Sequence, residues 1–339
     1  RYTTELPFQS VLDFGFDATA KQFAAAGAAS DVLRGLFEED DHYTDADSNA
    51  HGLVTFVGNH DVGRLGFDID SFNPGAPDAE RVARAELAHA LMFFSRGVPL
   101  IYYGDEQGFT GDGGDKDARQ DMMPSLVPSY NDDDLIGTAA TTADANFDPT
   151  HPLYQTFTDL AQVRGAHLAL RQGAQLHRHS EGGPGIYAFS RIERGERIEN
   201  LVALNNAVTD HTAIFPVGSP LTSFTELYPG GGPALSSDGD GVVTVFVPAL
   251  DVVVFRADTP MPDSPAAPGI TIVDPADGAE VAERFEVRAE LDHEIYAEVT
   301  FAVSVDGGPY ETVGTDDNTP YRVFFSVGDV PNGAQLRFK

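Results

Sequence analysis

The sequence contains no cysteine, and this absence excludes disulfide bonds and metal sites built from thiolates. Lysine is almost as scarce, since it occurs only at Lys21, Lys116 and Lys339. With 53 acidic against 21 basic residues, the formal net charge of the 339-residue chain is -32, which argues against nucleic acid and anionic membranes as partners. A run of about 18 uncharged apolar residues is also lacking, because Arg96 interrupts the best candidate, so no membrane span is expected.

The most informative segment runs from Leu53 to Arg64 and reads LVTFVGNHDVGR. Its apolar beginning is typical of a short strand buried on both faces, and Gly58 marks a turn or a close backbone approach. Asn59, His60 and Asp61 then follow the strand at its carboxyl end, where barrel enzymes hold their chemistry. The alternative is that Asp61 caps a following helix and that His60 is a buried, hydrogen-bonded histidine.

A second segment repeats this pattern further along the chain. Residues 97–108, GVPLIYYGDEQG, contain an apolar strand that ends in glycine and is followed by Asp105 and Glu106. Between the two strands, residues 78–96 carry apolar side chains at helical spacing and acidic side chains in the first turn, which predicts an amphipathic helix. Strand, helix and strand in this order predict a βαβ unit.

Together the two segments resemble the seventh and eighth strands of the (β/α)8 barrel of the α-amylase family, glycoside hydrolase family 13. Upstream, residues 6–16 (LPFQSVLDFGF) resemble the sixth strand, with a helix expected within residues 17–38. Downstream, residues 111–125 (GDGGDKDARQDMMPS) resemble the loop after strand eight in bacterial α-amylases and cyclodextrin glucanotransferases, with one residue more before MPS than in the latter. The resemblance extends in order from residue 1 to about residue 257.

The resemblance implies roles for five residues. Asp61 would be the carboxylate that stabilises the transition state, and His60, with Asn59 beside it, would bind the same glucose ring. An oxocarbenium-like transition state gains from such hydroxyl contacts as the ring flattens. Asp115 and Arg119 would hold a more distant glucose on the non-reducing side through charge-assisted hydrogen bonds. The alternative for that pair is an exposed loop ion pair of little energetic value.

The resemblance also implies that the catalytic nucleophile and the acid/base are missing. Retaining glycosidases carry these two carboxylates roughly 5 Å apart, and the family places them after strands four and five. The chain opens at Arg1, without an initiator methionine and shortly before the sixth strand. We therefore expect part of a longer protein, inactive alone. We also expect it to be poorly stable alone, because three strand–helix units cannot close a barrel of about 250 residues.

The chain as a whole is expected to be multidomain. Residues 1–181 would form the C-terminal part of the barrel (strands 6 to 8), with its last helix within residues 151–170. Short alternating strands over residues 182–257 predict an antiparallel β-sandwich, and the Pro-rich residues 258–268 predict a semi-rigid linker between independent domains. Period-two strands over residues 269–339 resemble a bacterial immunoglobulin-like module, truncated before its last strands, for which a spacer role is the default.

No cofactor is expected within this chain. Asp112, Asp115, Asp117 and Asp121 do not fit the EF-hand loop, and the family resemblance implies calcium only in the longer protein, with ligands mostly upstream of Arg1. A set of three histidines is interpreted as solvated or capping residues rather than metal ligands; it consists of His167, His177 and His179.

These observations predict a secreted or cell-surface hydrolase that acts on α-1,4-glucans such as starch and maltodextrins by a retaining mechanism. Two alternatives stay open. The first is a transglycosylase of the same family, such as a cyclodextrin-forming enzyme, and the second is a non-catalytic glycan-binding surface protein. The sequence does not indicate the oligomeric state.

Overall fold

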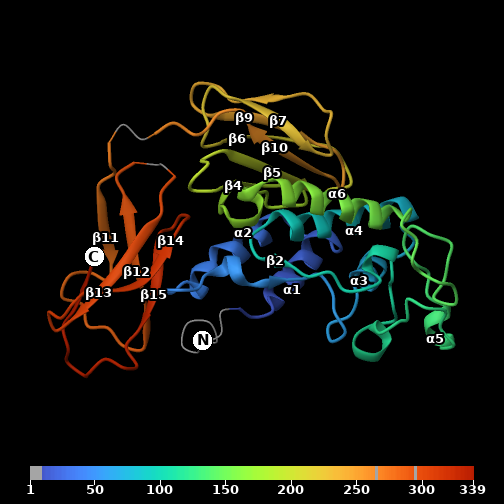
Figure 1. The fold of residues 1–339 in the computed structure, drawn as a ribbon, viewed down its shortest axis with the longest axis horizontal. Helices are drawn as coiled ribbons and strands as arrows, with labels where there is room; N and C mark the ends of the chain where they lie inside the picture. The colour runs from blue at the N-terminus through green and yellow to red at the C-terminus, as the bar shows by residue number, and fades with distance from the viewer. Residues whose placement is uncertain (1–9, 264–265, 294–295) are drawn as a thin grey trace.

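The computed structural model describes residues 10–263, 266–293 and 296–339, which form three successive parts (Figure 1). The first part, residues 10–173, contains the long helices, whereas the second and third parts are built from antiparallel strands. We call the second part, residues 174–257, the first β domain and the third part, from residue 270 onward, the second β domain. None of the helices in the described ranges has the length and apolarity to cross a membrane.

A very short parallel sheet lies at the centre of the first part. Strand β1 (Val54–Thr55) pairs in parallel with β2 (Val98–Pro99), and Leu12 forms a parallel bridge with Val54 on the other side. Both predicted strands are present but shorter than expected, and β2 has a neighbour on one side only within the described ranges. The beginning of the third predicted strand, before Ser10, lies outside the described residues.

The helices of the first part alternate with these strand segments. Where one helix was expected within residues 17–38, the chain forms two, because Gly27 adopts a left-handed conformation (φ +64°) that ends the first of them. The helix predicted to end at Arg96 ends at Phe94. The longer helices are α1 (Phe14–Ala24), α2 (Asp31–Glu38), α3 (Leu65–Phe72), α4 (Asp78–Phe94) and α6 (Pro152–Ala166), and the short ones are α5 (Pro128–Asn131), α7 (Leu168–Gln172), η1 (Asp40–Tyr43), η2 (Ala50–Gly52), η3 (Asp105–Gln107) and η4 (Asp115–Ala118).

The first β domain begins earlier than the predicted boundary at residue 182. Its first strand, β3 (Ala174–His179), pairs with β4 (Ile186–Ile192) and so belongs with the sheet rather than with the helices. The remaining strands of the six-stranded antiparallel sheet are, in spatial order, β5 (Glu199–Asn205), β10 (Val252–Ala257), β7 (Ser223–Tyr228) and β8 (Leu235–Ser236). Strands β6 (His211–Pro216) and β9 (Val242–Val247) form a separate pair over one face of this sheet.

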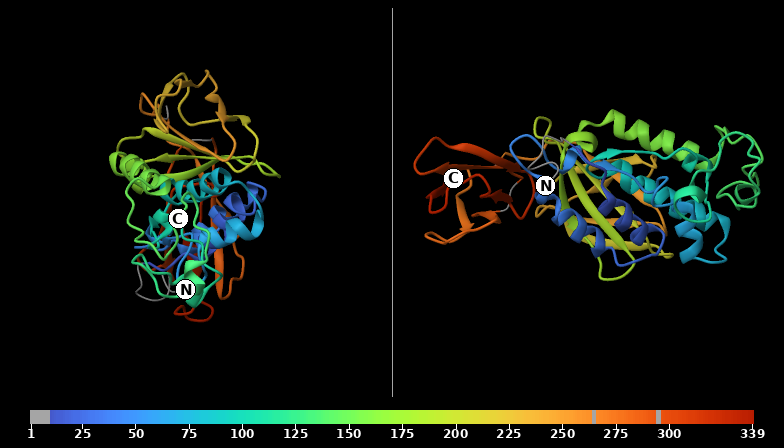
Figure 2. Two further views of the ribbon diagram at one scale, coloured as in Figure 1. Left: turned by 90° about the vertical axis from the view of Figure 1, so that its right-hand side faces the viewer. Right: turned by 90° about the horizontal axis from the view of Figure 1, so that it is seen from below.

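The first β domain shares a core with the helices. Side chains of β4 and β5 such as Tyr187 and Leu204 belong to one apolar cluster with Leu91 of α4 and Leu160 of α6. The opposite face of the same strands packs on β6 and β9, so β4 and β5 are buried along their whole length. Figures 1 and 2 show this sheet lying against α4 and α6. The first two parts are therefore one packed unit.

The second β domain is a small sandwich of two three-stranded antiparallel sheets. Strands β11 (Ile270–Asp274), β12 (Arg284–Leu291) and β15 (Arg322–Ser326) form one sheet. Strands β14 (Glu311–Asp316), β13 (Val299–Val305) and β16 (Leu336–Phe338) form the other. Buried side chains from both sheets, including Val287, Phe301 and Val323, fill the space between them.

The linker, predicted to be a semi-rigid spacer between independent domains, is bonded to the domain that precedes it. Its backbone is bonded to the first β domain, because the Asp258 amide donates to the Ser223 carbonyl (2.8 Å) and the Met261 amide donates to the Arg197 carbonyl (2.8 Å). Arg197 also forms an ion pair with Asp263. The first half of the linker is thus fixed along the domain that precedes it.

The second β domain docks on the helical part rather than standing apart from it. Arg322 donates to the carboxylate of Asp41 (2.7 Å) and to the carbonyl of Glu38 (2.6 Å), and the His42 ring stacks on Phe324 with centroids 4.0 Å apart. Figure 1 shows this domain beside the chain that leads into β1. It therefore lies at the amino-terminal ends of the short parallel strands.

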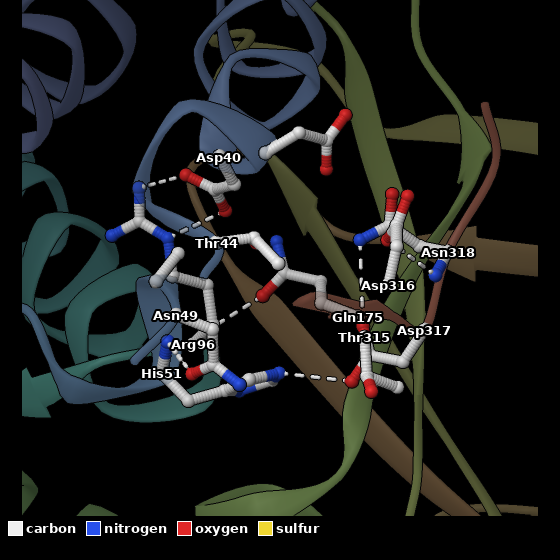
Figure 3. Close-up of a pocket in the computed structure, with 12 residues that line it drawn as sticks. Asp40, Thr44, Asn49, His51, Arg96, Gln175, Thr315, Asp316, Asp317 and Asn318 are labelled. Atoms are coloured by element: carbon white, nitrogen blue, oxygen red, sulfur yellow. Dashed lines mark hydrogen bonds and ion pairs between the residues drawn. The ribbon is translucent and has the colours of Figure 1, made fainter. Parts of the chain in front are cut away.

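A polar pocket lies where the three parts meet (Figure 3). Several of its charged groups are paired within the chain: Arg96 contacts Asp13 and Asp40 (2.6 Å each), and His51 contacts Asp317 (3.0 Å). The residues that line it come from η1, η2, β3 and the segment after β14 among others, and include Asp40, Asp41, Asn49, His51, Arg96, Gln175, Asp316 and Asn318. We assign no ligand to this pocket.

Docking of the second β domain is expected to weaken as the pH rises through 7. Burial outweighs the Arg322 contact and, with the nearby carboxylates Asp40 and Asp317, raises the pKa of Asp41 to about 7. Burial and repulsion from Asp41 likewise raise the pKa of Asp316. A carboxyl group with a raised pKa stabilises the folded state fully below its ordinary pKa, and this contribution is lost as the pH rises through the raised value.

Calorimetry of the protein at pH 5.5 and pH 8 tests this expectation. The unfolding transition of the second β domain should occur at a lower temperature at pH 8, and Asp316→Asn, which removes one of the two facing carboxyl groups, should reduce the difference. Equal transition temperatures at the two pH values would show that these carboxyl groups do not control docking.

Candidate active site

A tight loop follows β1 and presents the first candidate residues. Its ends are joined by two backbone hydrogen bonds of 3.1 Å between Asn59 and Gly63. The side chain of Asn59 is buried, and its oxygen accepts from the amides of Asp61 (2.7 Å) and Val62 (3.1 Å). Asn59 was predicted to bind substrate, but its side-chain oxygen is used to shape the loop.

His60 and Asp61 point outward from this loop. Their side chains are 49% and 63% exposed, and His60 Nε2 lies 3.4 Å from Asp61 Oδ1. The helix that follows, α3, begins at Leu65 with Arg64 at its N-cap, so Asp61 does not cap it. Hence the alternative interpretation, a capping aspartate beside a buried histidine, does not describe these residues.

The loop after β2 brings the second candidate pair to the same place. Arg119 contacts Asp115 at 3.0 Å and lies 3.9 Å from Asp61, and all three side chains are exposed. The two backbones touch, since a Cβ on Gly63 would lie 3.0 Å from the Gly113 carbonyl oxygen. Four of the five predicted residues thus form one exposed cluster, which alternates acidic and basic groups.

The sequence did not reveal the residues that lie behind this cluster. Arg64 is wholly buried and contacts Asp105 (3.1 Å) and Gln120 (2.6 Å). The ring of Tyr102 lies against Arg64, with 4.5 Å between the guanidinium carbon and the ring centroid, and its own centroid is 6.5 Å from that of His60. The sequence pattern had marked Asp105 as a residue that follows the second strand, but Arg64 was visible there only as an arginine three residues after Asp61.

A group of carboxylates near the loop has the geometry of a cation site. Oxygen atoms of Asp112, Asp132 and Asp133 lie within 4.8 Å of one another, and of these only Asp112 was among the acidic residues considered in the sequence. Burial, with the neighbouring acids, raises the pKa of Asp133 to about 6 even though Gln120 donates to it. Asp112 and Asp132 are exposed, and acidic groups often gather in this way without a metal, so we assign none.

The three histidines that were not interpreted as metal ligands in the sequence lie on other elements than the cluster around Asp61. His167 is the C-cap of α6, in agreement with a capping position. His177 and His179 lie in β3 and do not cap a helix. His179 Nε2 is 3.6 Å from a carboxylate oxygen of Glu181.

Comparison with known proteins places the helical part in a family. A family model for the catalytic domain of α-amylases matches residues 1–173 and ends one residue before β3. An α-amylase of Streptomyces lividans is 42% identical over all 339 residues, and a cyclomaltodextrin glucanotransferase of Thermoanaerobacterium thermosulfurigenes is 29% identical over 254 residues, 73% of the chain. The chain spans 37% and 30% of the lengths of these two relatives.

The fold is also found in solved structures. An Anoxybacillus α-amylase superposes with a TM-score of 0.58 at 19% identity, over 78% of this chain and 50% of that one. At this level of identity the similarity concerns the fold alone.

Proposed function

This chain belongs to the α-amylase family, and we propose that it is part of a longer, secreted enzyme that cleaves α-1,4-glucosidic bonds in starch and maltodextrins with retention of configuration. In this proposal residues 10–173 complete a (β/α)8 barrel, and the second β domain is an immunoglobulin-like module. The parallel order of Leu12, β1 and β2, separated by helices, supports the barrel. The two three-stranded sheets support the module.

Exposed apolar side chains on and beside the short parallel strands also support a missing half of the barrel. Leu12, Phe14, Val98, Leu100 and Ile101 are between 40% and 51% exposed in this chain. Large apolar patches on a protein surface usually mark a contact with another segment. Further barrel strands would cover these side chains and supply the nucleophile and the acid/base, which the proposed retaining mechanism requires.

The single observation that carries the proposal is the convergence of His60, Asp61, Asp115 and Arg119 at the carboxyl side of β1 and β2. Asp61 and His60 would hydrogen-bond hydroxyl groups of the glucose at the cleavage point and strengthen those bonds as positive charge develops on the ring. Asp115 and Arg119 would hold a glucose further along the glucan.

A cyclodextrin-forming transglycosylase is the second candidate. Residues 111–125 resemble the corresponding loop of both enzyme types, and a cyclomaltodextrin glucanotransferase is among the relatives. The two activities differ in whether water or a sugar hydroxyl attacks the intermediate, so their products separate them.

A starch assay with the intact, longer protein and with residues 1–339 tests the proposal. We expect new reducing ends from the longer protein only, because this chain contributes the stabilising carboxylate and not the catalytic pair. Linear products would indicate a hydrolase, and cyclic products would indicate the transglycosylase. If neither protein acts on starch or maltodextrins, the proposed function is wrong, and activity of residues 1–339 alone would refute the missing catalytic pair.

A further inference from the structure

A single buried guanidinium group ties together the segments that form the candidate active site. The Nε of Arg64 donates to Gln120 Oε1 (2.6 Å), and its Nη1 donates to the Tyr103 carbonyl (2.9 Å) and to Asp105 Oδ1 (3.1 Å). The guanidinium carbon also lies 5.0 Å from the ring centroid of Phe109. These partners belong to the segment after β2, whereas Arg64 belongs to the segment after β1.

The contact continues from Arg64 into the long loop. Gln120 is fully buried and donates in turn to Asp133 Oδ2 (2.6 Å), and the Tyr102 hydroxyl donates to the Ala118 carbonyl (3.1 Å). Arg119 lies between Ala118 and Gln120, so both of its neighbours in the chain are held by groups that touch Arg64. The guanidinium thereby fixes the backbone from which Arg119 reaches toward Asp61.

Building on the proposed function, we propose that Arg64 is a positioning residue that sets the spacing between Asp61 and the Asp115–Arg119 pair. That pair would bind a distant glucose, which only a longer glucan can supply. Its position therefore decides how much more tightly the enzyme binds a longer glucan than a shorter one. Lysine in place of Arg64 keeps the positive charge but lacks the planar fork that holds Gln120 and Asp105 at once. A small displacement of the loop then weakens binding at the distant glucose first.

Arg164 provides a matched control because it is a buried arginine of the same part of the protein. Its guanidinium donates to backbone carbonyls, including those of Phe93 (2.5 Å), Gly97 (2.7 Å) and Leu170 (2.7 Å), and none of these belongs to the candidate site. Replacing it therefore tests the effect of losing a buried guanidinium without disturbing the contact between Arg64 and the loop.

The test uses the intact, longer enzyme with Arg64→Lys, Arg164→Lys and Arg119→Ala. For Arg64→Lys we expect the ratio of kcat/KM on maltoheptaose to that on maltotriose to fall roughly tenfold, mainly through KM. When Arg64→Lys is combined with Arg119→Ala, the ratio should differ little from that of Arg119→Ala alone, because both substitutions act through the contact of Arg119 with the distant glucose. The proposal would be overturned if Arg64→Lys alone left the ratio unchanged. It would also be overturned if the effects of Arg64→Lys and Arg119→Ala on the ratio were additive, or if Arg164→Lys lowered the ratio as much.

Hydrogen exchange of residues 111–133 supplies a second readout that does not depend on activity. Exchange should be faster in Arg64→Lys and unchanged in Arg164→Lys. If the wild-type protein has no activity on glucans, the proposed function and the chain-length effect both fail, while faster exchange still supports the positioning role. Unchanged exchange in Arg64→Lys would refute that role directly.

Discussion

Asp61→Asn is expected to lower the kcat of the intact enzyme on starch by about a thousandfold, which corresponds to about 4 kcal/mol of transition-state stabilisation. The substitution removes the negative charge with little change in volume. Among the described residues the Asp61 carboxylate has two long ion-pair contacts, 3.4 Å to His60 and 3.9 Å to Arg119, and its side chain is mostly exposed. The folded state therefore loses little, and the unfolding temperature should stay near that of the wild type.

Steady-state kinetics on soluble starch, together with thermal unfolding, separate catalysis from folding. Asp117→Asn is the matched control, because Asp117 is an exposed aspartate of the facing loop and is not among the residues that contact Asp61. It should retain close to full activity. Unchanged turnover in Asp61→Asn would remove Asp61 from the proposed site, whereas equal losses in both variants would point to general damage to the loop.

The second large effect is expected for stability. Arg96→Met should lower the free energy of unfolding by about 3–5 kcal/mol, because it leaves two buried carboxylates without their cation. Arg96 is 2% exposed, contacts Asp13 once and Asp40 twice at 2.6–2.7 Å, and lies over the Phe37 ring. Asp13 also caps α1 by accepting from the Phe16 amide, so the loss extends to the start of that helix.

Urea unfolding of the intact protein at pH 7 measures this loss. Arg34→Met serves as the control, since Arg34 forms an exposed ion pair with Glu38 (2.6 Å) that is worth about 1 kcal/mol or less. The loss in Arg96→Met should shrink at pH 5, because burial raises the pKa of the Asp40 carboxyl and the variant lacks the Arg96 contact that lowers it. A loss below about 1 kcal/mol at pH 7 would show that the ion pairs of Arg96 with Asp13 and Asp40 contribute little to the stability of the fold.

Local patterns in the sequence predicted the elements that local forces determine. The helix starting at Asp78 was placed correctly at its first residue, because its apolar spacing and acidic first turn are contained within the helix itself. The prediction of a close backbone approach at Gly58 is also confirmed, since a Cβ there would lie 3.0 Å from the Gly63 carbonyl oxygen. These signals also placed His60 and Asp61 at the end of the strand.

Contacts between distant segments could not be predicted in this way. Strand β3 has the polar sequence AQLHRH, and it becomes a strand because it pairs with β4. The docking of the second β domain depends on Arg322 reaching Asp41, which is 281 residues away in the chain. In the sequence Arg64 is simply a charged residue that follows an Asn-His-Asp motif. Its role is visible only in the structure, where Tyr103, Asp105 and Gln120 accept hydrogen bonds from it.

The shared core of the first two parts has a consequence for how the protein is made. Phe16, Leu91 and Leu160 are translated well before Val252 and Val254 of β10, yet all five pack in the same cluster. During synthesis, the apolar faces of the helices stay uncovered until the ribosome has also released the sheet. Over that interval the emerging chain offers a large binding surface to chaperones, and translation that stops before residue 254 leaves this core unfilled.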